Sequence, residues 1–438
     1  MPSCFSVLLA KSSASPDTPR VAETLVGHTT MVLEAAERLL AVRGAASLVG
    51  VGLPTEELPA LCRIVRLAAL LHDLGKASEH FQLIVRHQRR APQLVLHDAL
   101  AAWLAWPGQP LHTRLRPATA SDGEYLMAVM AAAGHHRRFY SSVVASPESG
   151  AGSALSLLLS HDNVEQTLRL GERFGIVGGP RLSDVIIPVT HRSNPVQLFE
   201  EWELETEGAL LPRDLRLLAV AKALLIAADV AGSALPRAGE SAGWIESVLQ
   251  PQDGFADLQS LVARRLGQHQ PMEFQEAVAA ADAPVTVVRA GCGTGKTIAA
   301  LLWASRRHPG RPLWLTYPTT GTATEGFRDY VFGADVEGRL EHGRAEVDVD
   351  IFGLEEDGAA GRERDRLDAL RAWGCDVVTC TADTVLGLLH NHRRGMYAWP
   401  ALARRERARS RAPGASEGAR GALAPRLGLM LLGRKRAE

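Results

Sequence analysis

Residues 61–78 read LCRIVRLAALLHDLGKAS, and this stretch carries both the main fold signal and the first chemical signal of the chain. Leu61, Val65 and Ala68 recur at helical spacing, and the line that they form ends at His72, which is followed at once by Asp73. Histidine is neither a strong helix former nor a comfortable core residue, so its place on an apolar stripe needs an explanation. The stretch predicts a buried helix that brings an imidazole and a carboxylate into the interior.

The helical pattern extends in both directions from this stretch, from about residue 21 to residue 234. Apolar residues recur at i, i+3, i+4 and i+7, Ala and Leu dominate, and clusters of Gly and Pro interrupt the pattern. The firmest predicted helices are 21–40, 55–71, 99–106, 124–133 and 214–234. We expect this half of the chain to form an all-α domain.

Further histidines and a second acid stand on apolar stripes of the same region. His28 lies on the apolar face of the first predicted helix, which faces the interior of the domain. His97 is the first residue of the predicted helix HDALAAWLAW. His135 and His136 directly follow the helix EYLMAVMAAAG. Asp229 lies in ALLIAADVAGSAL, where almost nothing else is polar. A buried carboxylate is costly unless it is paired or binds a metal, so we expect a positive group to meet Asp229.

Each of these histidines, taken alone, is more often a satisfied core or surface residue than a metal ligand. Taken together, the five imidazoles and two carboxylates form the ligand set that a pair of divalent cations needs, with Asp73 able to bridge both ions. Two such ions can activate a water and stabilise the leaving oxygen of a phosphodiester. The histidines in polar or Arg-rich surroundings are expected at the surface: His80, His87, His112 and His161.

The ordered set resembles the metal-binding constellation of the HD phosphohydrolase superfamily: His28, His72, Asp73, Lys76, His97, His135, His136 and Asp229. The histidine doublet after AAG and the opening LLAKS are more similar to the HD nuclease domain of the type I CRISPR-associated helicase–nuclease, over roughly residues 10–235. The resemblance implies one ion held by His28, His72, Asp73 and Asp229, and a second held by Asp73, His97, His135 and His136. It also implies catalytic roles for Asp73 and Lys76, with Lys76 contacting a phosphate or a hydrogen-bonded water.

The predicted secondary structure changes near residue 271, where strands begin to alternate with helices. VTVVRA (285–290), PLWLTYP (312–318) and CDVVTCT (375–381) are predicted strands, and the alternation implies a parallel sheet in a separate α/β domain. AGCGTGKT (290–297) follows the first of them and opens a helix, which is the context of a phosphate-binding loop. We expect Lys296 to reach the β/γ-phosphates of ATP and Thr297 to bind magnesium.

The loop and its neighbouring motifs resemble the first RecA-like lobe of superfamily-2 helicases over residues 271–403. The resemblance implies ATP contacts from Gln275, Gly291, Gly293, Thr294, Gly295, Lys296 and Thr297, with Gln275 in PMEFQEAV reading the adenine. TYPTTGTATEGF (316–327) resembles the motif that holds the backbone of single-stranded DNA, and VVTCTADTVLG (377–387) resembles the motif that follows it. Together they imply DNA contacts from Pro318, Thr319, Thr320 and Thr381.

The sequence departs from the helicase pattern in two respects. No strand ending in an acidic pair follows Asp383, and LEEDGAA (354–360), in a polar stretch before the third strand, is a poor substitute. A second RecA-like lobe is missing, so we expect at most weak ATP binding and no translocation along DNA. We expect residues 236–270 to be a linker. Residues 404–438, rich in Arg, Ala and Gly, are expected to be a disordered tail, for which out-of-frame translation is one hypothesis.

Composition sets the broad class of protein. The chain has 48 Lys and Arg against 49 Asp and Glu, so binding to nucleic acid requires a local basic groove. Five cysteines without metal-ligand spacing fit a reducing compartment and no disulfide framework. No stretch is typical of a signal peptide or a membrane span, so we expect a cytoplasmic protein with no membrane partner.

The function that these patterns favour is a metal-dependent nuclease that cleaves single-stranded DNA. The family resemblance adds CRISPR antiviral defence and an RNA-guided surveillance complex as partner. The two ions could be magnesium, manganese, cobalt, nickel or iron, and ATP with magnesium would occupy the phosphate loop. Two alternatives remain open: an HD-type nucleotide phosphohydrolase, and an inactive remnant that only binds ATP or partner molecules.

Overall fold

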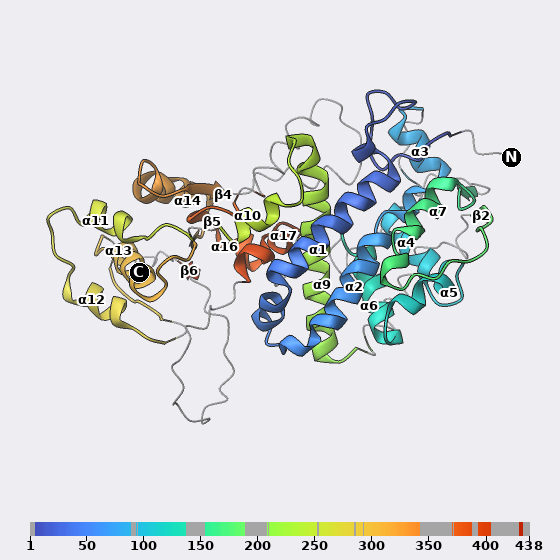
Figure 1. Ribbon diagram of the computed structural model, residues 1–438. Coiled ribbons are helices and arrows are strands. Elements are labelled where there is room, and N and C mark those ends of the chain that lie inside the picture. The colour runs from blue at the N-terminus through green and yellow to red at the C-terminus, as the bar shows by residue number, and fades with distance from the viewer. Residues whose placement is uncertain are drawn as a thin grey trace.

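The computed structural model describes residues 5–88, 93, 95–136, 154–188, 208, 210–251, 254–283, 286–291, 293–341, 370, 372–387, 393–403 and 429–431. The N-terminal part is a bundle of helices, and the C-terminal part is a four-stranded sheet flanked by helices (Figure 1). The expected order of a predominantly helical domain followed by a smaller α/β part is confirmed.

The helices of the N-terminal domain have these bounds: α1 Leu25–Gly50, α2 Leu58–Leu71, α3 Glu79–Val85, α4 His97–Ala105, α5 His112–Leu115, α6 Asp122–Ala133, α7 Asp162–Arg169 and α9 Pro212–Ala234. The five firmest predicted helices correspond to α1, α2, α4, α6 and α9, with ends that differ by a few residues except at the C-terminus of α1. A short antiparallel hairpin, β1 Ala154–Leu157 with β2 Val185–Pro188, adds two strands that the all-α expectation did not include.

The long helix α9 lies at the centre of this domain and contacts α1, α2 and α6. The expectation that no stretch is typical of a membrane span needs correction: the segment Pro212–Ala238 is long and apolar enough to cross one, with a mean hydropathy of 1.8, but 94% of its most apolar window is buried inside the protein. A Cβ atom on Gly232 would lie 2.9 Å from the backbone nitrogen of Val32, so this glycine lets α9 and α1 pack closely. The segment is therefore a core helix of the domain.

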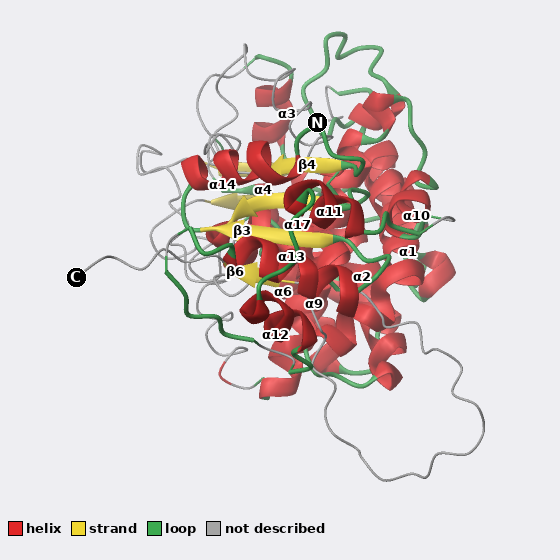
Figure 2. Ribbon diagram, turned by 90° about the vertical axis from the view of Figure 1, so that its left-hand side faces the viewer, coloured by secondary structure: helices red, strands yellow, loops and turns green. Residues whose placement is uncertain are grey.

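The C-terminal part contains these elements: α10 Trp244–Leu249, α11 Gln259–Leu266, α12 Glu273–Ala280, α13 Lys296–Arg307, β3 Leu313–Tyr317, α14 Thr320–Gly326, β4 Gly338–Glu341, β5 Val377–Thr381, α16 Ala382–Leu386, α17 Arg393–Leu402 and β6 Leu429–Leu431. The strands are parallel in the order β4-β5-β3-β6, and Figure 2 shows them side by side. The predicted strands 312–318 and 375–381 are confirmed as β3 and β5, which are buried along their whole length. Parallel strands connected by helices agree with the predicted architecture.

Three expectations about this part need correction. The described residues of VTVVRA, 286–290, form no strand, and Val287 is 79% exposed, because no neighbouring strand covers this segment. The expected linker 236–270 contains α10, which packs on α1, and α11, which packs on α13. Within the expected disordered tail, residues 429–431 form β6 beside β3, while 404–428 and 432–438 lie outside the described residues.

The helix α17 joins the two parts of the chain. Although it follows β5 in sequence, it packs on α9 and contacts α1 of the helical domain (Figure 1). Met396 and Trp399 of α17 form a buried cluster with Ala223 and Ile226 of α9. The helix that carries Asp229 is therefore held between the helical core and the C-terminal part.

Candidate metal centre

The centre begins at the C-terminal end of α2, where His72 and Asp73 directly follow the last helical residue. The apolar face of α2 is buried, so both side chains are carried inward and are at most 1% exposed. His72 Nδ1 lies 2.8 Å from the carbonyl oxygen of Ala69. A hydrogen bond donated by Nδ1 leaves the lone pair of Nε2 to accept a metal ion. Local backbone geometry thus selects the nitrogen that faces Asp73.

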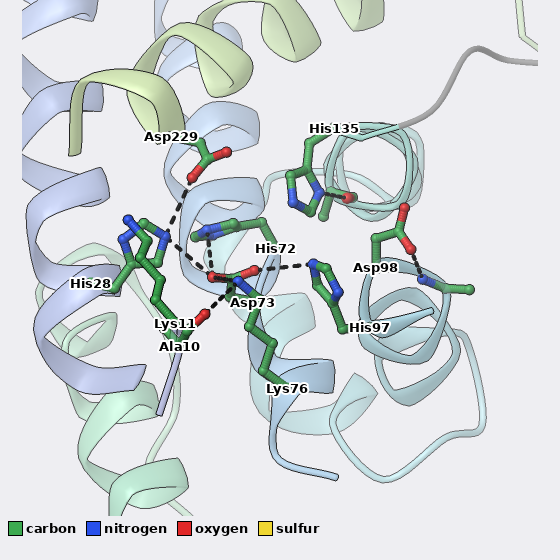
Figure 3. A network of polar contacts seen from close by, with 12 residues as sticks. Ala10, Lys11, His28, His72, Asp73, Lys76, His97, Asp98, His135 and Asp229 are labelled. Carbon is green, nitrogen blue, oxygen red and sulfur yellow. Dashed lines mark hydrogen bonds and ion pairs between the residues drawn. The ribbon is translucent and has the colours of Figure 1, made fainter. Parts of the chain in front are cut away.

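The two carboxylate oxygens of Asp73 point to different partners (Figure 3). Oδ2 lies 2.8 Å from Lys76 Nζ, 3.2 Å from His28 Nε2 and 3.4 Å from His72 Nε2. Oδ1 lies 3.5 Å from His97 Nε2. A carboxylate whose oxygens face two separate groups of imidazoles is suited to bridge two cations.

One side of the centre is formed where α1 and α9 approach each other. His28 on α1 directs Nε2 to Oδ1 of Asp229 on α9, at a distance of 3.3 Å. The imidazole of His28 is thus a partner for the acid that the sequence placed in an apolar helix. The ring of His28 also packs edge-on against that of His72, with ring centroids 5.5 Å apart.

The other side of the centre is formed by the beginning of α4 and the end of α6. His97 is the first residue of α4, while His135 and His136 follow Gly134, at which α6 ends. His135 Nδ1 lies 2.6 Å from the carbonyl oxygen of Ala132, which directs its Nε2 toward the centre as at His72. The rings of His97 and His136 have centroids 5.0 Å apart.

The seven candidate ligands predicted from the sequence fall into two groups. One comprises His28, His72 and Asp229, and the other comprises Asp73, His97, His135 and His136. Within each group the ligand atoms lie within 4.8 Å of one another. The structure therefore brings together all seven side chains, in the division that the family resemblance implied, with Asp73 between the two groups.

The donor atoms of the centre fit divalent cations in type and in state. Among the described residues, these buried atoms contact only one another, Asp229 and Lys76, and have no further hydrogen-bond partner: Nε2 of His28, His72, His97 and His135, and both carboxylate oxygens of Asp73. Buried polar atoms without partners are costly, whereas metal coordination would satisfy each of them. Imidazole nitrogen combined with carboxylate oxygen suits manganese, iron, cobalt, nickel or zinc better than calcium.

Burial holds several of these imidazoles in the neutral form that binds metal. It lowers the pKa of His97 to about 3 and that of His135 to about 4, and it also lowers the pKa of His28. The charge of Lys11 adds to the lowering at His28. These three imidazoles are therefore neutral at pH 7, and metal binding need not first remove a proton from them.

Asp73 remains ionised despite its burial. Burial alone would raise the pKa of Asp73, but the charges of His72 and Lys76 outweigh it and hold the pKa well below the usual value. At His72 burial likewise opposes the charged form, yet the carboxylate of Asp73 raises the pKa overall. Lys76, only 7% exposed, also donates a hydrogen bond of 3.0 Å to the carbonyl oxygen of Ala10. The expected contact of Lys76 with a phosphate stays a prediction.

Two histidines that were expected at the surface are buried in the structure. The structure also places near the centre polar residues that the sequence reasoning missed. His80 and His161 are only 9% and 8% exposed. His161 is buried because its Nδ1 accepts a hydrogen bond from the backbone of α7 while its Nε2 lies 3.1 Å from the carbonyl oxygen of Phe5. Lys222 on α9 is fully buried. Near the centre, Gln82 donates a hydrogen bond to the carbonyl oxygen of Leu9, and Lys11 donates one to Ser233 on α9. Lys222 stands in an apolar helix, and the reasoning that identified Asp229 would have found it too.

The candidate nucleotide loop lies before α13. Gly293 and Gly295 adopt positive φ angles of 77° and 81°, which glycine permits in a tight loop. Lys296 Nζ donates hydrogen bonds to the carbonyl oxygens of Ala290 and Gly291 at 3.1 and 2.5 Å. Two further candidate ATP contacts lie near the lysine: Thr297 directly follows it, and Thr294 precedes it by two residues. Thr294 Oγ1 donates a hydrogen bond to the carbonyl oxygen of Gly291, also a candidate, at 2.9 Å.

Gln275 supports this loop from α12. Its side chain is 1% exposed, and Nε2 donates to the carbonyl oxygen of Gly295 at 3.2 Å, while Oε1 accepts from the backbone of Met272 at 2.9 Å. The amide is thus engaged with the protein backbone. Its role in reading adenine stays a prediction.

The candidate DNA contacts lie at one edge of the sheet. Pro318, Thr319 and Thr320 connect β3 to α14, and Thr381 ends β5. Tyr317, which ends β3, is paired with Thr381, so both motifs meet at the carboxyl edge of the parallel strands. Thr319 is exposed and caps α14 by accepting a hydrogen bond from the backbone of Thr322. Hydroxyls and backbone amides at this edge are suited to phosphate contacts.

Comparison with known proteins finds a family model that matches a large part of the helical domain. The model of the Cas3 HD domain matches residues 9–171. A Myxococcus xanthus (strain DK1622) protein named as a CRISPR-associated nuclease/helicase Cas3 is 53% identical over 402 residues, which cover 90% of this chain and 54% of that protein. The chain spans about half the length of this curated relative.

Solved structures with a related arrangement are more distant. A crystal structure of T. fusca Cas3 with ADP matches at a TM-score of 0.44 and 17% identity, covering 90% of this chain and 46% of that one. A structure titled as a CRISPR RNA-guided surveillance complex, pre-nicking, matches at a TM-score of 0.34 and 18% identity, covering 93% and 51%.

Proposed function

We propose that this chain is a metal-dependent nuclease that hydrolyses phosphodiester bonds of single-stranded DNA in CRISPR defence, on the premise that residues 9–171 match the model of the Cas3 HD domain. One observation carries the proposal. Seven side chains from separate elements converge on two ligand groups, and the two oxygens of Asp73 face both groups. The named relative from Myxococcus xanthus supports the assignment to a CRISPR-associated nuclease.

The chain's own residues would organise the reaction by holding two divalent cations and setting their charge environment. When bound, such a pair supplies Lewis-acid activation of water and stabilises negative charge on the scissile phosphate. His28, His72 and Asp229 would hold the first ion with Asp73. His97, His135 and His136 would hold the second ion, again with Asp73. Lys76 keeps the carboxylate of Asp73 ionised and oriented through the contact at Oδ2.

Digestion of a single-stranded DNA oligonucleotide tests this proposal. Cleavage is expected with at least one of magnesium, manganese, cobalt, nickel or iron, and chelation by EDTA should stop it. Asp73→Ala removes the carboxylate between both groups and should abolish cleavage. His87→Asn is the matched control, because His87 is exposed and its positive φ of 57° suits asparagine. Persistent cleavage by purified Asp73→Ala protein rules the assignment out.

The same preparation separates the two alternatives. A nucleotide phosphohydrolase would release phosphate from mononucleotides and leave the DNA oligomer intact. A module that only binds partners would purify without metal, take up none on dialysis and cut neither substrate. The buried Nε2 atoms of His97 and His135, which have no hydrogen-bond partner outside the centre, favour a metal-loaded centre over a packed, metal-free one.

We further propose that the loop 291–297 binds ATP with magnesium and that the carboxyl edge of β3 and β5 contacts DNA. Lys296 and Thr297 would bind the phosphates and the magnesium ion, while Gln275 supports the loop. Pro318, Thr319, Thr320 and Thr381 would bind the DNA backbone, and an RNA-guided surveillance complex would deliver it. Lys296→Ala should weaken binding of a fluorescent ATP analogue, and unchanged binding would argue against this loop.

A further inference from the structure

The N-terminal segment, residues 8–11, runs beside the metal centre as a buried part of the domain. Leu8, Leu9 and Ala10 are at most 2% exposed. The backbone nitrogen of Leu25 donates to the carbonyl oxygen of Leu8 at 2.8 Å, and the nitrogen of Ala10 donates to that of Glu23 at 2.8 Å. The segment is thus fixed along the start of α1, the helix that carries His28.

A single buried amide, that of Gln82, ties this segment to the turn that follows Asp73. Gln82 lies on α3 and is 0% exposed. Its Oε1 accepts a hydrogen bond from the backbone nitrogen of Leu9 at 2.9 Å, and its Nε2 donates to the carbonyl oxygen of Leu9 at 2.9 Å. Nε2 also donates to the carbonyl oxygen of Lys76 at 2.9 Å. Gln82 therefore joins the backbone of the N-terminal segment to that of Lys76.

Through the next two residues the segment reaches Asp73, by way of Lys76 (Figure 3), and the turn of α9 that follows Asp229. The carbonyl oxygen of Ala10 accepts a hydrogen bond from Lys76 Nζ at 3.0 Å, and the same ammonium lies 2.8 Å from Asp73 Oδ2. Lys11 Nζ donates to Ser233 Oγ at 2.6 Å. Ser233 follows Asp229 by four residues, which is about one turn of α9.

We propose that Gln82 is a positioning residue of the metal centre. By fixing residues 8–11, Gln82 keeps the ammonium of Lys76 in contact with Asp73. It also keeps Lys11 in contact with Ser233, about one turn along α9 from Asp229. This inference rests on the proposed two-ion site and adds a residue that contacts neither ion. Hydrogen-bond partners that orient metal ligands affect metal affinity by about 10- to 100-fold, and Gln82 acts one step further out through Lys76. We expect its removal to weaken manganese binding by about 10-fold, the low end of that range.

Titration of the full chain with manganese, followed by calorimetry, tests the proposal. Gln82→Met keeps the length of the side chain and removes all three hydrogen bonds. Gln82→Glu keeps the acceptor for Leu9 but turns a carboxylate oxygen toward the carbonyl oxygens of Leu9 and Lys76, so both variants should bind manganese more weakly than the wild type. Gln88→Met is the matched control on an exposed glutamine and should bind as the wild type does.

A second control separates positioning from general loss of stability. Ile245→Ala removes a fully buried side chain from α10, which contacts α1, and should lower stability while leaving manganese affinity unchanged. Two-ion binding by wild type together with unchanged affinity in Gln82→Glu overturns the role of Gln82 alone. Absence of manganese binding by wild type overturns the proposed function. If Gln82→Met fails to fold by circular dichroism, the Gln82→Glu titration decides the question.

Discussion

Acidification of the metal-free protein should destabilise it strongly, because its centre excludes protons that the unfolded chain accepts. The pKa of His97 is about 3 and that of His135 about 4 in the folded protein, against 6.5 in the unfolded chain. Above pH 6.5 both states are neutral and neither histidine contributes. Below it the unfolded state gains protons first, so the free energy of unfolding falls as the pH is lowered.

The magnitude follows from the distance between the working pH and the unfolded pKa. At pH 5, protonation of the unfolded chain lowers the free energy of unfolding by about 2 kcal/mol for each histidine, or by about 4 kcal/mol for both, relative to its value at neutral pH. His28, whose pKa burial also lowers, acts in the same direction, whereas His72, whose pKa Asp73 raises against the effect of burial, acts in the opposite one. A loss of this size is a large part of the stability of a typical protein.

Urea unfolding in EDTA at pH 7.5 and pH 5, followed by helical circular dichroism, measures this loss. His97→Gln removes one of the two sites and should roughly halve the difference between the two pH values. His87→Asn, at an exposed histidine, should leave the difference as in the wild type. Equal stability of the metal-free wild type at both pH values would refute the reasoning, as would an equal effect of the two substitutions.

Two further substitutions test the packing that positions the centre. Gly75→Ala should destabilise the domain by about 1–3 kcal/mol or more in urea unfolding, because its Cβ would lie 1.9 Å from the backbone oxygen of His97; wild-type stability would show that α4 moves away at no cost. Trp399→Ala should lower the thermal midpoint, since loss of a buried Trp costs about 3–5 kcal/mol, and Trp399 packs α17 on α9. An unchanged midpoint would mean that α17 contributes no stability to the helical domain.

The metal centre could be predicted from the sequence because its residues break a strong rule. Histidines and a carboxylate on apolar helical stripes are costly unless something satisfies them, so His28, His72 and Asp229 were visible without a structure. Gln82 and Lys11 were not, because a single polar residue near a helix end or in an irregular segment breaks no pattern. The family resemblance gave Lys76 a role in the site, but its hydrogen bond to the carbonyl oxygen of Ala10 could not be predicted, because Ala10 is distant along the chain.

The sheet was only partly predictable because strand formation depends on neighbours. The apolar runs of β3 and β5 are long enough to signal buried strands, and they pair with each other. The segment 285–290 is also rich in β-branched residues, yet its described residues pair with no strand. β4 and β6 have only four and three residues, too few for a period to be read, and β6 is set in a stretch of biased composition.

The buried helix α9 has a consequence for synthesis of the chain. Emerging from the ribosome, its apolar stretch meets the same criteria of length and hydropathy as a segment destined for a lipid bilayer. Three of its packing partners, α1, α2 and α6, precede it and have already been translated when it emerges, whereas α17 follows it. Docking onto them can shield the stretch as soon as it leaves the exit tunnel. A permuted gene that placed α9 first would expose this helix to the insertion machinery and to aggregation.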